Sequence, residues 1–465
     1  MMRLSALLLV ALSGATQEEK VFRAGAAASN ITPPLGEPIV GGWAPAPATH
    51  IHDELHARCL VLDDGKTKLA FVVCDNVGIP REVFDEAKKI VQKETGIGPE
   101  HLLFSATHTH SATSARGDKP LEQEYARFLV RRIADGVRRA LNALEPARIG
   151  WGSAQAPEHL FNRRYFLKTG TVVNPFGGQD QVMMNPGVGN PNVLKPSGPT
   201  DPEVSFILVR ARKGERPLAL LASYSLHYVG GVPNGHVSAD YFAFFADRIR
   251  ELLGADRQDP PFVGMLSNGT SGDVNNIDVL GKAERLPPYE KMKQVAHSVA
   301  EKVFQASGGI AYRDGVPLDA RLKELTLRAR KPSPDLVARA KEILARPKDA
   351  KPGHIRELAY ASRTLQLAEA PEEVSVPLQA FRIGDLGVAA IPFEVFTDIG
   401  LEIKKRSPLA KTFTISLANG SYGYLPTPEH HQLGGYETWL GTNRVEVDAS
   451  RKITETVLAL LAELK

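Results

Sequence analysis

Apolar runs of strand length alternate along the chain with stretches whose apolar residues recur every three or four positions. From residue 21 to residue 105 the pattern is strand-like runs broken by turn residues, and residues 81–96 predict a helix. A strand at residues 102–106 and a long amphipathic helix at residues 122–144 follow. This mixture of two periodicities predicts an α/β fold.

The rest of the chain continues the mixture. The predicted elements are a strand at residues 147–154, a hairpin at 203–211 and 217–230, a helix starting near Ser238, a strand running into a glycine-rich turn over 261–276, a helical hairpin at 331–367, strands at 374–396 and 412–420, and a helix at 450–464. We find no internal repeat and no low-complexity linker. We therefore expect a single large domain over residues 16–465, with a mixed β-sheet surrounded by helices.

Residues 174–201 are rich in Gly, Pro and Asn and carry no clear periodicity. A structureless stretch of this length is uncommon inside a compact domain and is usually a functional loop or lid. We expect this loop to influence which substrate is accepted.

The first fifteen residues, MMRLSALLLVALSGA, combine a basic start at Arg3, a short apolar stretch, and small residues before Thr16. This pattern is typical of a secretory signal peptide, with an uncleaved anchor or a frayed N-terminus as alternatives. No later segment approaches the roughly 20 apolar residues that span a bilayer. We expect a soluble mature protein that is secreted or periplasmic.

Composition narrows the classes of partner. Of the 465 residues, 43% are hydrophobic and 23% charged, and 56 basic residues nearly balance 53 acidic ones. No Lys/Arg block stands out, so we expect no nucleic-acid partner. The two cysteines, Cys59 and Cys74, lie on neighbouring apolar runs. With a two-residue Asp64-Gly65 turn, Cys59 would face Ala70, which favours two buried free thiols over a disulfide.

The stretch SATHTHS places His108 and His110 two positions apart at the end of an apolar run. Side chains two apart on a strand share one face, so both imidazoles can address one metal ion. A pair of polar residues that merely ends a strand is an equally good interpretation of this motif alone.

Other strand ends carry metal-competent groups as well. His227 ends LLASYSLH, Glu394 ends GVAAIPFE, and Tyr424 follows the strand at 412–420. Ligands at the ends of successive strands can converge at one sheet edge, where open α/β folds place their sites. Burying a carboxylate such as Glu394 is costly unless it is paired or bound to metal, although a rim position in solvent would also suit it.

Seven stretches, taken in order, resemble the catalytic domain of the neutral, non-lysosomal ceramidase family. They are ASNITPPLG, SATHTHS, FNRR, SLHYVGG with SADYF, SNGTSGDVNN, IPFEVF and GYLPTPEHHQLGGYE. The resemblance covers nearly all of the chain after residue 15. It implies a zinc-dependent hydrolase that cleaves an amide bond, most characteristically of an N-acyl lipid such as ceramide.

The resemblance also implies residue roles. His108, His227, Glu394 and Tyr424 would bind one zinc ion per chain, while His110, Arg163 and Tyr436 would line the pocket beside it. Zinc-activated water would attack the acyl carbonyl, and a pocket residue would stabilise the oxyanion or protonate the leaving amine. Asp240 either orients a ligand imidazole or starts a helix, and we leave it outside the ligand set.

Two features depart from the family pattern. Asn275 stands where the family's GDVSPN motif has a serine; we count it as a candidate catalytic residue by position, and the replacement puts ceramide as the substrate in doubt. The resemblance ends near Lys465, so we expect no immunoglobulin-like C-terminal domain. Three hypotheses for the function remain. The protein is an N-acyl lipid amidase with transient contact to a membrane surface, a zinc hydrolase of another amide or ester, or a non-catalytic extracellular binding protein. Another divalent ion would also suit these ligands, and the sequence leaves the oligomeric state undetermined.

Overall fold

The computed structural model describes residues 21–42, 44–117, 120–347 and 349–465. The expected signal peptide at residues 1–15 lies outside the described residues and stays a prediction. Within the described residues, no helix combines the length and apolar character that crossing a bilayer requires.

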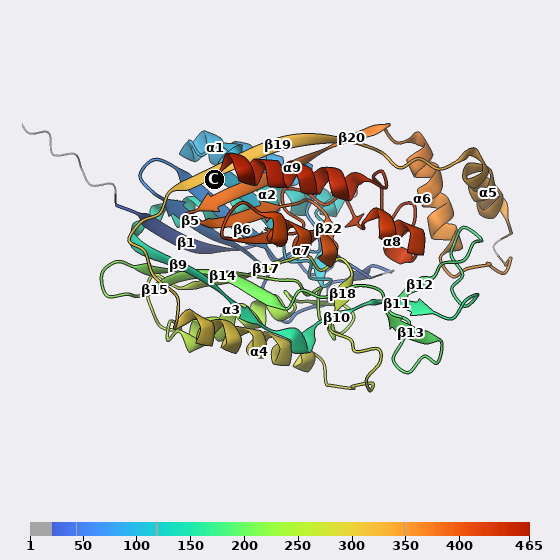
Figure 1. The fold of residues 1–465 in the computed structure, drawn as a ribbon, viewed down its shortest axis with the longest axis horizontal. Helices are drawn as coiled ribbons and strands as arrows, with labels where there is room; N and C mark the ends of the chain where they lie inside the picture. Colours follow the sequence, from blue (N-terminus) through green and yellow to red (C-terminus); the bar gives the residue numbers. More distant parts are fainter. Residues whose placement is uncertain (1–20, 43, 118–119, 348) are drawn as a thin grey trace, which may run out of the picture.

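The centre of the fold is a mixed sheet of eight strands (Figure 1). Its order is β17 (Val263–Asn268), β15 (Pro217–Tyr224), β14 (Glu203–Ala211), β9 (Glu145–Gln155), β1 (Arg23–Asn30), β5 (His56–Asp63), β6 (Lys68–Cys74) and β7 (Leu102–Ala106). A second sheet has the order β19 (Leu318–Arg328), β20 (Glu373–Ile383), β21 (Leu386–Ala390) and β23 (Lys411–Ile415). The expected mixed sheet surrounded by helices is confirmed, and the second sheet is an addition that the sequence did not predict.

Most helices of the described residues pack on the outer faces of the sheets, while α5 and α6 lie at one end of the molecule (Figure 1). They are α1 (Arg81–Thr95), α2 (Pro120–Asn142), α3 (Tyr241–Leu252), α4 (Glu290–Ser307), α5 (Pro334–Ala345), α6 (Glu357–Glu369), α7 (Thr397–Arg406), α8 (Pro428–Leu433) and α9 (Ala449–Glu463). The predicted helical hairpin at 331–367 is confirmed as α5 and α6, and the closing helix as α9.

One topological unit occurs three times. In each unit three strands form an antiparallel meander, a helix crosses over, and a fourth strand pairs in parallel with the third. The units are β1-β5-β6-β7 with α1, β9-β14-β15-β17 with α3, and β19-β20-β21-β23 with α7. The sequence analysis found no internal repeat, so the repetition lies in topology and escapes detection as a pattern of residues.

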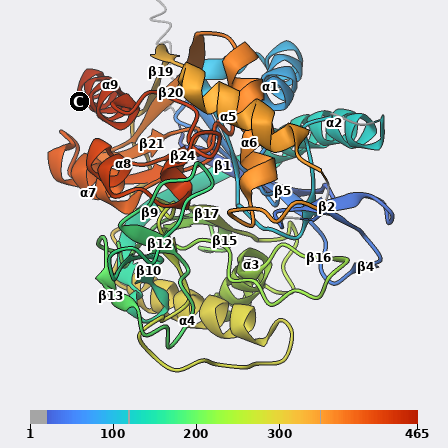
Figure 2. The same ribbon diagram turned by 90° about the vertical axis from the view of Figure 1, so that its right-hand side faces the viewer.

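The two sheets pack face to face, because each strand carries apolar side chains on both faces. Leu60 and Leu62 of β5 point into the core between the sheets, where the ring centroids of Phe71 and Phe381 lie 5.2 Å apart. Cys59 and Val61, the alternate residues of β5, lie in the core beneath α1 and α2. Helices α3 and α4 cover the second unit, and α7 and α9 cover the third, which gives four layers (Figures 1 and 2).

The short strands lie mainly in the loops at one end of the sheets. They are β2 (Pro38–Val40), β3 (Ala46–Pro47), β4 (His50–Ile51), β8 (Ala112–Thr113), β10 (Phe161–Asn162), β11 (Arg164–Leu167), β12 (Val182–Met184), β13 (Val193–Pro196), β16 (His236–Val237), β18 (Val274–Asn275), β22 (Glu394–Val395) and β24 (Tyr424–Leu425). The stretch 174–201 is therefore not structureless, because β12 and β13 both pair with β11. Asp180 also fixes this stretch by accepting hydrogen bonds from the Gly435 amide (2.9 Å) and the Trp439 indole (2.7 Å).

The cysteines are free and buried, as predicted, although the predicted register was wrong. Cys59 pairs with Val72 and not with Ala70. The turn has four residues because the Asp64 carboxylate accepts the backbone N–H groups of Lys66 (2.8 Å) and Thr67 (2.6 Å). Burial raises the pKa of the Cys59 thiol to about 12, so this thiol stays protonated and unreactive near neutral pH.

Lys88 on α1 contacts a residue of the third unit, so its titration tests the packing between the first and third units. Its ammonium is buried and donates to the Asn419 side chain at 2.7 Å, and burial lowers its pKa to about 7. In the unfolded chain the Lys88 ammonium has a pKa of about 10.4. Between pH 7 and 10 the unfolded state therefore binds more protons than the folded state, and the free energy of unfolding rises with pH. We expect the free energy of unfolding of the wild type to gain roughly 1–2 kcal/mol from pH 7 to 9 relative to Lys88→Met. Urea titrations of both proteins at the two pH values check this, and parallel curves would contradict it.

Candidate metal centre

His108 follows β7, the fourth strand of the first unit. The strand ends at Ala106, so the two histidines do not alternate on a strand as predicted. His108 has a φ of 76°, a left-handed conformation that non-glycine residues rarely adopt, and its N–H donates to the Asn76 carbonyl at 2.9 Å. Its Nδ1 contacts the Val77 carbonyl. The Nδ1 proton is therefore engaged, and the Nε2 lone pair points into the site.

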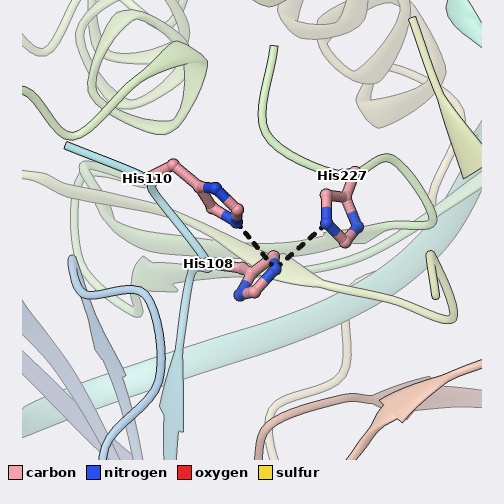
Figure 3. Close-up of side chains that lie close together, drawn as sticks. All are labelled: His108, His110 and His227. Atoms are coloured by element: carbon pink, nitrogen blue, oxygen red, sulfur yellow. Dashed lines mark hydrogen bonds between the residues drawn. The ribbon is translucent and has the colours of Figure 1, made fainter. Parts of the chain in front are cut away.

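His227 follows β15, the third strand of the second unit. Its Nδ1 lies 3.0 Å from the Ser271 carbonyl, which fixes the same tautomer, with a free lone pair on Nε2. The two Nε2 atoms of His108 and His227 are 3.1 Å apart (Figure 3). When both Nδ1 atoms carry the proton, no hydrogen bond joins the two Nε2 atoms, and their lone pairs repel unless a cation lies between them.

His110 completes a cluster of three imidazoles. Its Nε2 lies 3.1 Å from that of His108, and its ring stacks on Tyr228 with centroids 3.7 Å apart. Gly41 packs against this ring so closely that an added Cβ would lie 2.7 Å from it. Burial lowers the pKa of His110 well below its usual value, with His108 and Arg163 adding to the effect. His110 is thus neutral near pH 7.

Glu394 approaches the same point from the third unit. Its Oε2 lies 3.2 Å from His108 Nε2 and 3.8 Å from His227 Nε2. This oxygen is buried and has no hydrogen-bond donor among the described residues. Burial raises the pKa of Glu394, whereas the hydrogen bond from Tyr424 and the positive charge of Arg163 lower it and favour the carboxylate form. An ionised, orphaned carboxylate oxygen beside imidazole lone pairs is the arrangement that a divalent cation relieves.

Tyr424 is the direct neighbour of Glu394, since β22 and β24 pair in parallel with these two residues in register. Its hydroxyl is hydrogen-bonded to the Glu394 carboxylate and to Arg163, whose guanidinium carbon lies 5.3 Å from the centroid of the tyrosine ring. Burial raises the pKa of Tyr424 well above its usual value, so the phenol is protonated in the absence of a cation. A bound cation would favour its ionised form.

Arg163 is held by a buried ion-pair triad. Its Nε donates to Glu437 Oε1 at 3.1 Å, and its Nη2 donates to the Gly272 carbonyl at 2.8 Å. The second carboxylate oxygen of Glu437 accepts from Arg164 Nη1 at 2.7 Å, and neither Arg164 nor Glu437 has measurable exposure. Arg163 therefore positions Tyr424, with most of its donors already engaged.

Tyr436 lies at the end of a cavity of about 450 Å³ that reaches His108 and Glu394. Its ring centroid is 5.8 Å from that of Tyr424. Burial raises the pKa of Tyr436, with Tyr360 and Glu394 adding to the effect, so its hydroxyl keeps its proton. The phenol can donate to a ligand in this cavity.

Among the described residues, no contact joins the Asn275 side chain to this cluster. Its side-chain amide donates to Asn185 at 2.6 Å and accepts from the Ile277 amide at 3.0 Å, which ties the 174–201 stretch to β18. Gly272, which precedes Asn275 in the same glycine-rich turn, packs against Glu394. An added Cβ there would lie 2.6 Å from the Glu394 carbonyl, so only glycine permits this approach.

Of the two roles expected for Asp240, the structure shows the one at the start of a helix. It precedes α3 and accepts the backbone N–H groups of Val229 (2.9 Å), Gly230 (2.8 Å) and Tyr241 (2.7 Å). It thus fixes the loop that follows His227 and holds no ligand imidazole directly.

A second group with metal-ligand atoms close together consists of Asp273, Asp398 and His430. Both oxygens of Asp273 already accept hydrogen bonds, from Thr397 (2.9 Å) and from Asn162 (3.0 Å). This group is therefore a weaker candidate than the histidine cluster, where a buried oxygen lacks a donor.

Sequence reasoning named the side chains that converge but missed those that hold them. Glu437 directly follows Tyr436 in a stretch that was already noted, and its adjacency was a signal that could have found it. The carbonyl acceptors of Val77 and Ser271 belong to the polar segments after β6 and β17, and main-chain acceptors leave no mark in a sequence.

No family model matches the chain. Among solved structures, the neutral ceramidase from Pseudomonas aeruginosa resembles it with a TM-score of 0.69 and 16% identity, over 96% of this chain and 75% of that chain. A ceramidase complexed with C2 gives a TM-score of 0.68 and 15% identity over the same shares. At this identity the likeness shows a shared fold, which confirms the fold that the sequence resemblance implied.

Glu437→Gln tests the buried triad. Removing one charge from a buried ion pair leaves its partners uncompensated, so we expect the free energy of unfolding to fall by about 3 kcal/mol. Glu429→Gln is the matched control, because Glu429 pairs with Arg451 on the surface and its loss is expected to cost less than about 1 kcal/mol. Equal effects of the two substitutions in urea unfolding would contradict the role assigned to Glu437.

Proposed function

We propose that the protein is a zinc-dependent hydrolase that cleaves the amide bond of an N-acyl compound. The observation that carries this proposal is the orphaned Glu394 oxygen beside the Nε2 lone pairs of His108 and His227. The shared fold with two ceramidase structures favours amide hydrolysis over other uses of such a site. In the net reaction the acyl C–N bond breaks, the oxygen of water joins the acyl carbon, and the amine gains a proton.

His108, His227, Glu394 and Tyr424 would hold the ion. When bound there, zinc supplies Lewis acidity that activates water and polarises an acyl carbonyl. Arg163 keeps Tyr424 beside Glu394 through its bonds to Glu437 and Gly272.

Two residues remain for proton handling. Tyr436 keeps its proton and lies in the cavity, so its hydroxyl can donate to the carbonyl oxygen as negative charge develops. His110 is neutral near pH 7, so it can accept a proton and pass it to the leaving amine.

An ester, or another amide, is the second candidate for the bond that is cleaved. Asn275 is engaged by Asn185 and Ile277 rather than by the histidine cluster, so a contact that the family serine would make in its place is not reproduced here. The zinc site and the residue roles are the same for this candidate.

Metal content and activity separate the proposed ligands from the pocket residues. We expect about one zinc per chain in the wild type, and loss of both zinc and amide cleavage in His108→Ala and Glu394→Ala. His110→Ala is expected to keep zinc but to lose at least about 10²-fold in kcat, the usual cost of removing a general acid or base. Elemental analysis and fatty-acid release from N-acyl sphingosine and short N-acyl amides measure the two quantities.

Three results would contradict parts of this proposal. A wild type without metal would overturn the site. Loss of zinc in His110→Ala would move His110 into the ligand set. Stoichiometric zinc without turnover of any acyl amide or ester would favour a binding protein on the same scaffold.

A further inference from the structure

The cavity that reaches His108 and Glu394 has mostly polar walls. Its aliphatic lining consists of Val40 and Val77, and the other lining residues are glycine, serine, His108, Tyr436 and charged residues. A long acyl or sphingoid chain binds best against apolar walls, because burying it contributes in proportion to the apolar area removed from water. This cavity offers little of that surface.

Two guanidinium groups line the same cavity. Arg116 follows β8 in the first unit, and Arg363 belongs to α6. Arg363 lies close enough to Tyr436 to lower the pKa of its phenol, in opposition to the effect of burial. The negative charge of Glu394 raises the pKa of Tyr436. His108, Glu394, Tyr436 and Arg363 therefore line one cavity.

Arg444 adds a third positive charge close to Arg116 and Arg363. Burial lowers the pKa of Arg444, and Arg116 and Arg363 lower it further, which places three like charges within electrostatic reach of one another. The lining carries one carboxylate besides Glu394, namely Glu122. The lining carries two arginines against Glu122 and Glu394, so it gains excess positive charge once a divalent cation is bound at Glu394.

We propose that this cavity selects N-acyl substrates that carry an acidic group, a carboxylate or a phosphate, which binds to Arg116 and Arg363 while the acyl amide lies at the histidine cluster. Guanidinium groups match both anions, because they donate paired hydrogen bonds in a planar fork. This inference rests on the proposed amide hydrolysis and narrows its substrate class from N-acyl compounds in general to acidic ones.

Matched substrate pairs test the inference on the zinc-loaded full-length protein. The carboxylate pair is N-octanoylglycine and its neutral carboxamide, and the phosphate pair is N-octanoylethanolamine phosphate and N-octanoylethanolamine. Each pair shares the acyl bond and differs in the acidic group. We expect kcat/KM for octanoate release to be at least about tenfold higher for the acidic member of one pair, and the responding pair identifies the anion.

Arginine variants assign the preference to the cavity. Arg363→Gln and Arg116→Gln should each reduce the acidic-to-neutral ratio of kcat/KM toward one. Arg356→Gln is the matched control. Its guanidinium carbon lies 5.2 Å from the centroid of the Tyr436 ring, but the residue lines a neighbouring cavity, so the ratio should stay at the wild-type value.

The other outcomes are decisive as well. Equal cleavage within both pairs, preference for ceramide over all four compounds, or a ratio that survives Arg363→Gln and Arg116→Gln would overturn the acidic subsite and leave the hydrolase intact. Zinc-loaded protein that cleaves none of these amides, ceramide included, would overturn the inference together with the proposed amide hydrolysis.

Discussion

Two imidazole nitrogens without protons and a carboxylate oxygen that finds no donor in the described part of the chain face one point inside the protein. Hydrogen bonds on the far side of each imidazole, to the carbonyls of Val77 and Ser271, fix this arrangement and prevent either ring from turning its N–H group toward the other. Such a cluster is unfavourable in a low-dielectric interior unless a cation occupies it. The left-handed backbone of His108, the close approach of Gly272 to Glu394, and the Glu437 triad behind Arg163 all maintain this arrangement.

The threefold topology explains how His108 and Glu394, nearly 300 positions apart, meet. Each unit places a third and a fourth strand in parallel, and their carboxyl ends leave the sheet on the same side. His108 follows the fourth strand of the first unit, His227 the third strand of the second, and Glu394 the third strand of the third. Because the two sheets pack face to face, these three ends surround one space.

The sequence predicted the strong local patterns well. Helices α1 and α2, the β14–β15 hairpin and the strand at 102–106 have clear periodicities and formed as expected, except that β15 ends at Tyr224 and not at residue 230. The predicted strand at 412–420 ends early, at Ile415, because Leu417 and Asn419 adopt left-handed conformations that no apolar pattern encodes. The second sheet and the repeated unit depend on which strands pair over long distances, and periodicity carries no information about partners.

The same division applies to the candidate site. Polar groups at strand ends were visible in the sequence, and the resemblance to ceramidases assigned them roles. The charge of the adjoining cavity was not visible, because Arg116 and Arg363 come from segments with no shared motif. Fold similarity therefore accounts for the architecture, while the proposed choice of substrate depends on the residues of the cavity wall.

Anomalous diffraction at the zinc edge, from crystals of the purified protein, tests the central claim most directly. The account predicts one anomalous peak bounded by His108 Nε2, His227 Nε2 and Glu394 Oε2, within about 2.0–2.2 Å of each atom once the site has adjusted to the ion. A peak at Asp273, Asp398 and His430 instead, or no peak in protein that hydrolyses an acyl amide, would contradict it.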